Sequence, residues 1–75
     1  MAKETEQVKT IAKIDTDRIK SCLLELHMDK EEFAKALGIS IGTLSNKMSG
    51  YRSWTLNDMI VIIRLFNKPL EFFLL

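Results

Sequence analysis

The chain carries a single cysteine and a single histidine, and neither has the neighbours that catalysis or metal binding needs. With only Cys22 and His27 as soft ligands, metal-site spacing is absent, and Cys22 has no disulfide partner. No carboxylate cluster stands at the spacing of a general acid and base. The most informative segment of the chain is instead residues 30–50, where two short capped helices are expected. We therefore expect binding rather than catalysis, with no cofactor and no metal.

Length and composition limit the chain to one small domain. With 75 residues there is little room for an enclosed substrate cavity, and a hydrophobic fraction of 47% predicts a packed core. The net charge of +1 neither requires nor excludes a nucleic acid partner. The longest apolar run, residues 59–63, is too short to span a membrane, and residues 1–14 lack the apolar region of a signal peptide. We expect a cytoplasmic protein.

Four helix starts share one pattern, in which a polar capping residue lies between an apolar residue before it and another four positions after it. The predicted caps are Asp15, Asp29, Ser40 and Thr55. The first helix is expected to end near His27, and Glu32 completes a capping box at the start of the second. Gly38 and Gly50 are expected to end the second and third helices in left-handed conformations.

The C-terminal part of the chain is also predicted to be helical. The apolar face of the fourth helix is expected to consist of Leu56, Met59, Ile60, Ile63 and Phe66. Pro69 is placed to begin a fifth, short helix. No period-two alternation marks a strand, and residues 1–13 are expected to form a flexible tail. The predicted fold class is all-α, a compact five-helix domain over residues 14–75.

The second and third predicted helices carry the most specific pattern in the chain. Only Gly38, Ile39 and Ser40 join them, which forces the two helices to cross steeply, and Ala34 is small enough to allow their close approach. The pattern is FAKALGIS over residues 33–40, followed by Thr43, Leu44, Ser45 and Gly50. It resembles the Cro and phage-repressor family of helix-turn-helix proteins, in its small phage type. The resemblance implies a lambda repressor-like DNA-binding fold.

In that family the second helix of the motif enters the major groove, and dimers bind half-sites about one DNA turn apart. The resemblance therefore implies double-stranded DNA as the partner. The residues at or beside the family's base-facing positions are Ile41, Gly42, Thr43, Ser45 and Asn46. Asn46 can bond bidentately to adenine, and Ile41 can pack on a thymine methyl. Gly42 stands where relatives often carry hydrogen-bonding side chains.

A second set of donors is expected to contact the sugar-phosphate backbone, from helix N-termini and from the loop after the third helix. This set is Lys30, Lys35, Ser40, Lys47, Tyr51, Arg52 and Ser53. Lys47 departs from the family, which usually has an apolar residue at that position. Its stem is expected to pack while its ammonium reaches a phosphate, and Met48 takes over the apolar role.

The C-terminal end of the chain is strongly apolar. Its apolar residues are Leu70, Phe72, Phe73, Leu74 and Leu75. A small domain cannot easily cover all of them, so part of the run is expected to fold back and the outermost residues to meet a second copy or a partner repressor. Two functions stay open: a DNA-binding transcriptional regulator, or a modulator of the same fold that binds another repressor. An enzyme is the least expected.

Overall fold

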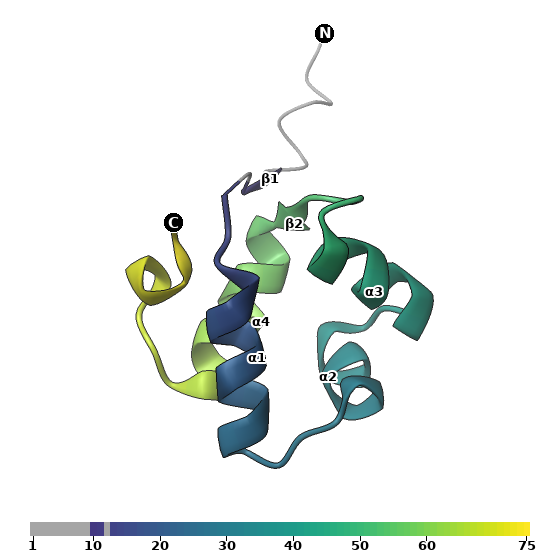
Figure 1. Ribbon diagram of the computed structural model, residues 1–75, viewed down its shortest axis with the longest axis horizontal. Helices are drawn as coiled ribbons and strands as arrows, with labels where there is room; N and C mark the ends of the chain where they lie inside the picture. The colour runs from purple at the N-terminus through teal and green to yellow at the C-terminus, as the bar shows by residue number, and fades with distance from the viewer. Residues whose placement is uncertain (1–9, 12) are drawn as a thin grey trace, which may run out of the picture.

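The structure is a computed structural model that describes residues 10–11 and 13–75. In these residues four α-helices and one short 3₁₀ helix are accompanied by two strands of two residues each (Figure 1). The elements are β1 (Thr10–Ile11), α1 (Thr16–Glu25), α2 (Lys30–Leu37), α3 (Ile41–Ser49), β2 (Trp54–Thr55), α4 (Leu56–Phe66) and the 3₁₀ helix η2 (Leu70–Phe73). The expected flexible tail falls on residues 1–13, of which 1–9 and 12 lie outside the described residues.

Local capping determines where the helices begin. The capping residues are Asp15, Asp29, Ser40 and Thr55. Each side chain accepts a hydrogen bond from an amide in the first turn of the helix that follows, which satisfies a donor without an intrahelical partner. Two of the caps are reciprocal boxes, completed by Glu32 in α2 and by Asp58 in α4. The four predicted helix starts are confirmed.

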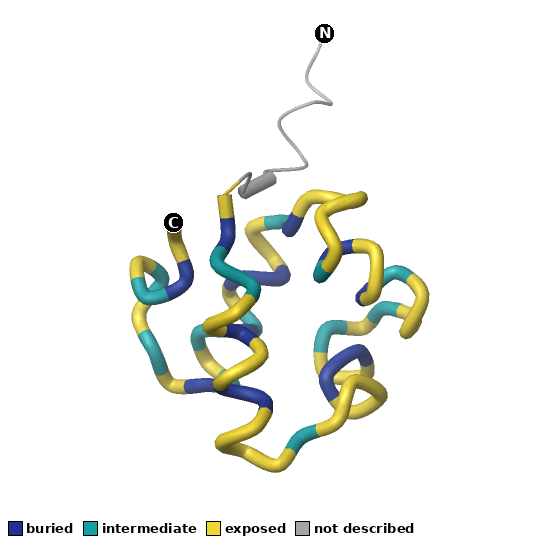
Figure 2. Tube along the Cα trace, in the orientation of Figure 1, coloured by how far each residue is buried: buried dark blue, intermediate teal, exposed yellow. Residues whose placement is uncertain are grey.

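The hydrophobic core takes side chains from all four α-helices and from η2 (Figure 2). Its largest fully buried side chains are Phe33, Phe73, Ile19, Leu44, Met59 and Ile62. Aromatic rings run through it, with ring centroids 5.6 Å apart for Phe33 and Phe66 and 6.0 Å apart for Phe66 and Phe73. Such tilted pairs contribute about 0.5–1.5 kcal/mol each beyond the area they bury. The rings thus connect α2, α4 and η2.

Helix α4 buries part of the predicted face. Met59 and Phe66 are buried as expected, and Ile63 is half-buried against the core. Leu56 and Ile60 are instead 42% and 39% exposed, and Ile62, outside the predicted face, is fully buried. The helix is apolar on several sides, so its pattern alone does not choose a face. Asp58, Ile62 and Phe66 follow one another at spacings of four and share a side of the helix, so the buried side is turned toward Ile62 relative to the predicted one.

The two strands pair antiparallel, although the sequence predicts no strand. Thr10 lies opposite Thr55, and further along the same segment Ile14 forms an isolated bridge with Leu74. The N-terminal segment thus touches both the chain after α3 and the C-terminus, and its pairing begins before the expected domain boundary at residue 14. Strands of two residues are too short to show an alternating pattern, which is why sequence periodicity misses them.

The C-terminal run forms a single 3₁₀ turn rather than a fifth α-helix. Pro69 precedes η2 with an extended ψ of 159°, so it is not the first helical residue. Arg18 of α1 holds the turn in place: its guanidinium donates to the Phe72 carbonyl oxygen at 3.1 Å and lies 4.8 Å from the centre of the Phe72 ring. A stretch this short gains its geometry from these contacts, because 3₁₀ helices are not stable alone.

The apolar residues of the C-terminus divide between the core and the surface. Phe73 is fully buried, which corrects its assignment to a partner surface, and Leu70 and Phe72 are half-buried against the core. Leu74 and Leu75 stay 41% and 79% exposed. The burial of Phe73 follows from its packing on Phe66, a contact that the sequence order of the two residues does not reveal.

Candidate nucleic-acid interface

The turn between α2 and α3 depends on a glycine. Gly38 has a φ of 74°, in the left-handed region that favours glycine, and its amide bonds back to the last turn of α2. The Ile39 amide then donates to the Ala34 carbonyl oxygen at 3.0 Å. Ser40 begins α3 at once, because its Oγ accepts from the Thr43 amide at 3.1 Å. The predicted helix-turn-helix geometry is therefore present, with Ala34 buried.

One side of α3 faces away from the core. Leu44 and Lys47 are buried, and they fix the inward side. The exposed residues at spacings of three and four are Gly42, Ser45, Asn46 and Ser49. These spacings place them along one line of the helix. The outward side of α3 therefore carries short polar side chains and one position without a side chain.

The residues expected at or beside base-facing positions are mostly exposed. The exposed ones are Ile41, Gly42, Ser45 and Asn46. Thr43 is half-buried, and its Oγ1 accepts a hydrogen bond from the Ser40 Oγ at 3.0 Å, so it belongs partly to the helix cap. Sequence reasoning missed Ser49, which shares the outward side. Its spacing of three from Asn46 is the signal that could have found it.

The loop after α3 is bonded to that helix. Gly50 ends α3 with a φ of 93°, as predicted, and the amide of Arg52 donates to the Asn46 carbonyl oxygen at 3.1 Å. Tyr51, Arg52 and Ser53 are all exposed. The hydrogen bond keeps these three side chains beside the C-terminal half of α3, so that the loop and the outward side of α3 form one surface.

The remaining exposed members of the expected phosphate set lie on α2 and at the start of α3. Lys30 is the first residue of α2, Lys35 lies in its last turn, and Ser40 is the N-cap of α3. The structure thus divides the set into one group on the helix-turn-helix unit and another in the loop of residues 51–53. Ser40 of the first group begins α3, and the second group follows the end of α3.

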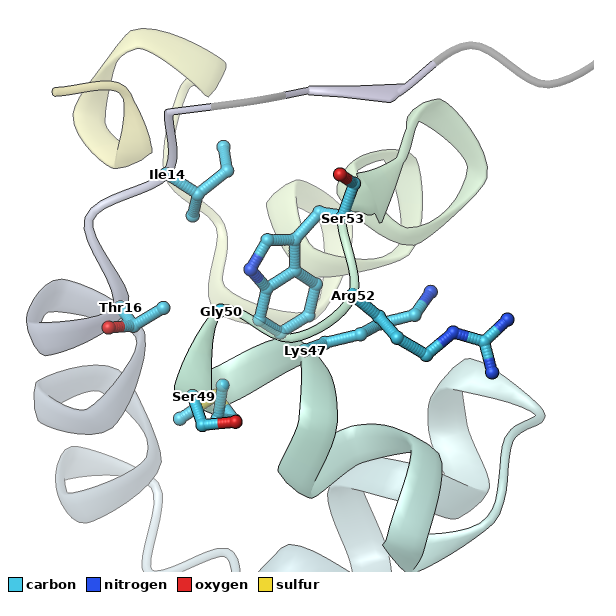
Figure 3. A pocket seen from close by; sticks show the side chains of 9 residues that line it. Ile14, Thr16, Lys47, Ser49, Gly50, Arg52 and Ser53 are labelled. Atoms are coloured by element: carbon cyan, nitrogen blue, oxygen red, sulfur yellow. The ribbon is translucent and has the colours of Figure 1, made fainter.

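A hollow of about 220 Å³ lies beside the C-terminal end of α3 (Figure 3). Thr16 of α1, Ser49 of α3 and the loop residues Arg52 and Ser53 line it, together with Trp54. Trp54 is buried. Arg52 extends its guanidinium away from Ile14 and Thr16, which lie on the opposite side of the hollow (Figure 3). The hollow therefore leaves the charged end of Arg52 available to a partner outside it.

Lys47 does not reach outward, which corrects its assignment to the phosphate set. Its side chain is 6% exposed, and its Nζ pairs with the carboxylate of Asp58 in α4. The same Oδ2 atom accepts from the Thr55 amide at 2.9 Å, so one carboxylate both caps α4 and holds α3. A buried ammonium requires such a partner because its desolvation is costly. The partner lies 11 residues along the chain on another helix, beyond the range of local patterns.

Cys22, the single cysteine of the chain, is buried. Burial raises the pKa of the Cys22 thiol, Glu25 adds to the effect and Lys68 opposes it, so the nucleophilic thiolate is disfavoured. No three histidine, cysteine or acidic residues are grouped to hold a metal in the described part of the chain. The helices of residues 13–75 include none long and apolar enough to cross a membrane.

The capped helices α2 and α3 are joined by a glycine turn, and one side of α3 faces outward. This arrangement defines a helix-turn-helix protein. Residues 19–73 match the family model described as helix-turn-helix, and the chain belongs to this family, in its Cro and phage-repressor type. The protein is accordingly a DNA-binding regulator. No curated protein and no solved structure matches the chain.

Proposed function

We propose that the protein is a sequence-specific transcriptional regulator of the phage repressor and Cro type that places α3 in the major groove of double-stranded DNA. The outward side of α3 is the observation that carries the proposal, because Ser45 and Asn46 are exposed there while Leu44 and Lys47 anchor the opposite side. An asparagine amide presents a donor and an acceptor side by side, which matches N6 and N7 of adenine. The family match supports the proposal, since it covers both helices of the motif.

The exposed donors beside α3 are proposed to bind phosphates and so to set its register in the groove. The loop of residues 51–53 is tied to α3 through the Arg52 amide and the Asn46 carbonyl oxygen. A phosphate bound by Arg52 or Tyr51 therefore constrains the helix that reads the bases. Lys30 and Lys35 supply cations from α2.

Asn46→Ala is expected to remove about 1–3 kcal/mol of discrimination at one base pair, whereas Arg52→Ala weakens binding to all sequences about equally. The difference arises because an amide in the groove distinguishes bases, and a guanidinium on a phosphate does not. To measure this, the unsubstituted protein is first used to enrich a duplex from a randomised pool. Competition with singly changed duplexes then gives the base preference of each variant.

Asn57→Ala is the matched control for this experiment, because Asn57 is also an exposed helical asparagine but lies in α4. It should keep the base preference of the unsubstituted protein. Equal losses on every duplex for Asn46→Ala would remove Asn46 from the base-reading set. An unsubstituted protein that enriches no sequence from the pool would overturn the proposed function as a whole.

We also propose that two copies of the chain associate through the C-terminal end. Leu74 and Leu75 are exposed apolar residues at the end of the chain, next to the segment of residues 13–15 with which they bond. A two-fold dimer covers such a patch with its own copy, and paired copies suit paired half-sites on DNA. The same patch favours the second candidate function, a modulator that docks on a different repressor.

The double variant Leu74→Ser/Leu75→Ser is expected to shift the protein from dimer to monomer in sedimentation while its circular dichroism stays helical. Both residues are exposed, so folding loses little, whereas an interface loses its apolar centre. Leu24→Ser is the matched control, since Leu24 is 77% exposed on α1. A parent protein that sediments as a monomer would contradict the dimer, and the double variant should then be tested for weaker binding to a neighbouring repressor.

A further inference from the structure

Gly42 is a feature of α3 that the fold does not require. It lies in the first turn of the helix with a helical backbone, unlike Gly38 and Gly50, which have positive φ values. A Cβ built at Gly42 would meet the Ser40 Oγ at 3.9 Å, an ordinary van der Waals distance. Glycine inside a helix costs about 0.5–1 kcal/mol relative to alanine. Neither backbone conformation nor packing therefore explains the missing side chain.

Gly42 leaves a gap, a position without a side chain, on the outward side of α3. Among the described residues, apart from the helix backbone and the two chain neighbours of Gly42, the Ser40 Oγ is the one atom within 4 Å of a Cβ built there. Ile41 stands beside it, 41% exposed, and Ser45 and Asn46 follow one turn later. The gap thus has an aliphatic side chain at one edge and polar groups at the other. On the base-pair edges of the major groove, the apolar group is the C5-methyl of thymine. A gap bordered by Ile41 matches that methyl better than it matches a polar base edge.

We propose that Gly42 is a specificity-determining residue whose missing side chain lets a thymine methyl lie against the backbone of α3, covered by Ile41. The inference rests on the proposed function, because it requires α3 to enter the major groove. A methyl group at position 42 would occupy the space of the thymine methyl and hold the helix away from the base edge. The Asn46 side chain, one turn further along α3, would then lie farther from the base that it contacts.

The proposal predicts opposite changes in stability and in DNA affinity for Gly42→Ala. Because the new methyl is unstrained in the free protein, Tm should rise by about 2–8 °C. Affinity for the duplex that the unsubstituted protein enriches from a randomised pool should decrease about tenfold, since the Asn46 contact weakens with it. Ser21→Ala, at an exposed position of α1, also improves helix propensity and should leave the affinity unchanged.

Replacing the thymines of the enriched duplex by uracil, one at a time, tests the contact with the thymine methyl, because the two bases differ only in that group. For the unsubstituted protein, one such replacement should weaken binding about fourfold, the effect of exposing one buried methyl. Gly42→Ala should instead bind the duplex with uracil at this position more tightly than the duplex with thymine, because loss of the thymine methyl leaves room for the alanine methyl. The inference is wrong, and the proposed function stands, if Gly42→Ala binds the enriched duplex as tightly as its parent or if no replacement weakens the parent. If the unsubstituted protein enriches no duplex, both this inference and the proposed function are wrong.

Discussion

Lys47→Met is expected to lower the free energy of unfolding by about 3–5 kcal/mol, although the family usually carries an apolar residue at this position. The cause is Asp58, which is 5% exposed and would lose its counter-charge while still accepting from the Thr55 amide. Domains of this kind have a total stability of about 5–15 kcal/mol, so the loss is a large fraction of the whole. Urea unfolding at neutral pH, followed by circular dichroism, measures it directly.

The double variant Lys47→Met/Asp58→Asn separates the unpaired charge from the change of shape. An asparagine keeps an oxygen for the Thr55 amide and carries no charge, so about half or more of the lost stability should return. Lys35→Met is the matched control at an exposed position of α2, and it should stay within about 0.5 kcal/mol of the parent. If Lys47→Met is as stable as this control, the ion pair contributes nothing to the fold.

The helix starts and the helix-turn-helix unit could be predicted because short-range interactions determine them. The box of Asp29 and Glu32 spans three residues, and the turn at Gly38 follows from one residue that tolerates a positive φ. Burial of Phe33, Ala34 and Leu44 follows the same spacing that the sequence shows. Local patterns therefore placed α2 and α3 with the correct side toward the core.

Features that depend on contacts between distant segments could not be predicted in this way. The burial of Phe73 depends on its packing against Phe66, and the burial of the charged Lys47 and Asp58 depends on their pairing with each other. The pairing of β1 with β2 joins segments more than forty residues apart, as Thr10 and Thr55 show. Each of these features is invisible to a pattern of a few residues, because the partner is known only once the chain has folded.

The candidate site likewise has one part that local sequence patterns predict and another that depends on contacts between distant segments. The resemblance located α3 and the loop of residues 51–53, since the family's motif fixes their spacing. Exposure decided what the motif could not: it placed Ser49 on the outward side of α3 and showed that Lys47 is buried. From the sequence, a lysine beside base-facing positions suggests a phosphate contact. In the folded chain Lys47 pairs with the carboxylate of Asp58 instead.

The burial of Lys47 also changes the charge that the protein can present to DNA. The expected phosphate set contained four cations, and with Lys47 paired inside the fold the exposed ones are Lys30, Lys35 and Arg52. The proposed dimer would therefore bring about six cations to a duplex. Each phosphate that they neutralise releases condensed counterions, which makes binding depend on salt with a slope of about −0.9 per phosphate in a logarithmic plot.

DNA affinity is accordingly expected to decrease about a thousandfold between 50 and 200 mM salt, with a logarithmic slope near −5 for a dimer with about six phosphate contacts. Arg52→Ala should make the slope shallower by about 2, one contact for each copy, and Lys20→Ala on the exposed side of α1 should leave it unchanged. Fluorescence anisotropy of a labelled duplex over a salt series measures all three slopes. A flat response would contradict binding through phosphate contacts and would favour the modulator that acts on a partner repressor, because an apolar interface at Leu74 and Leu75 releases few ions.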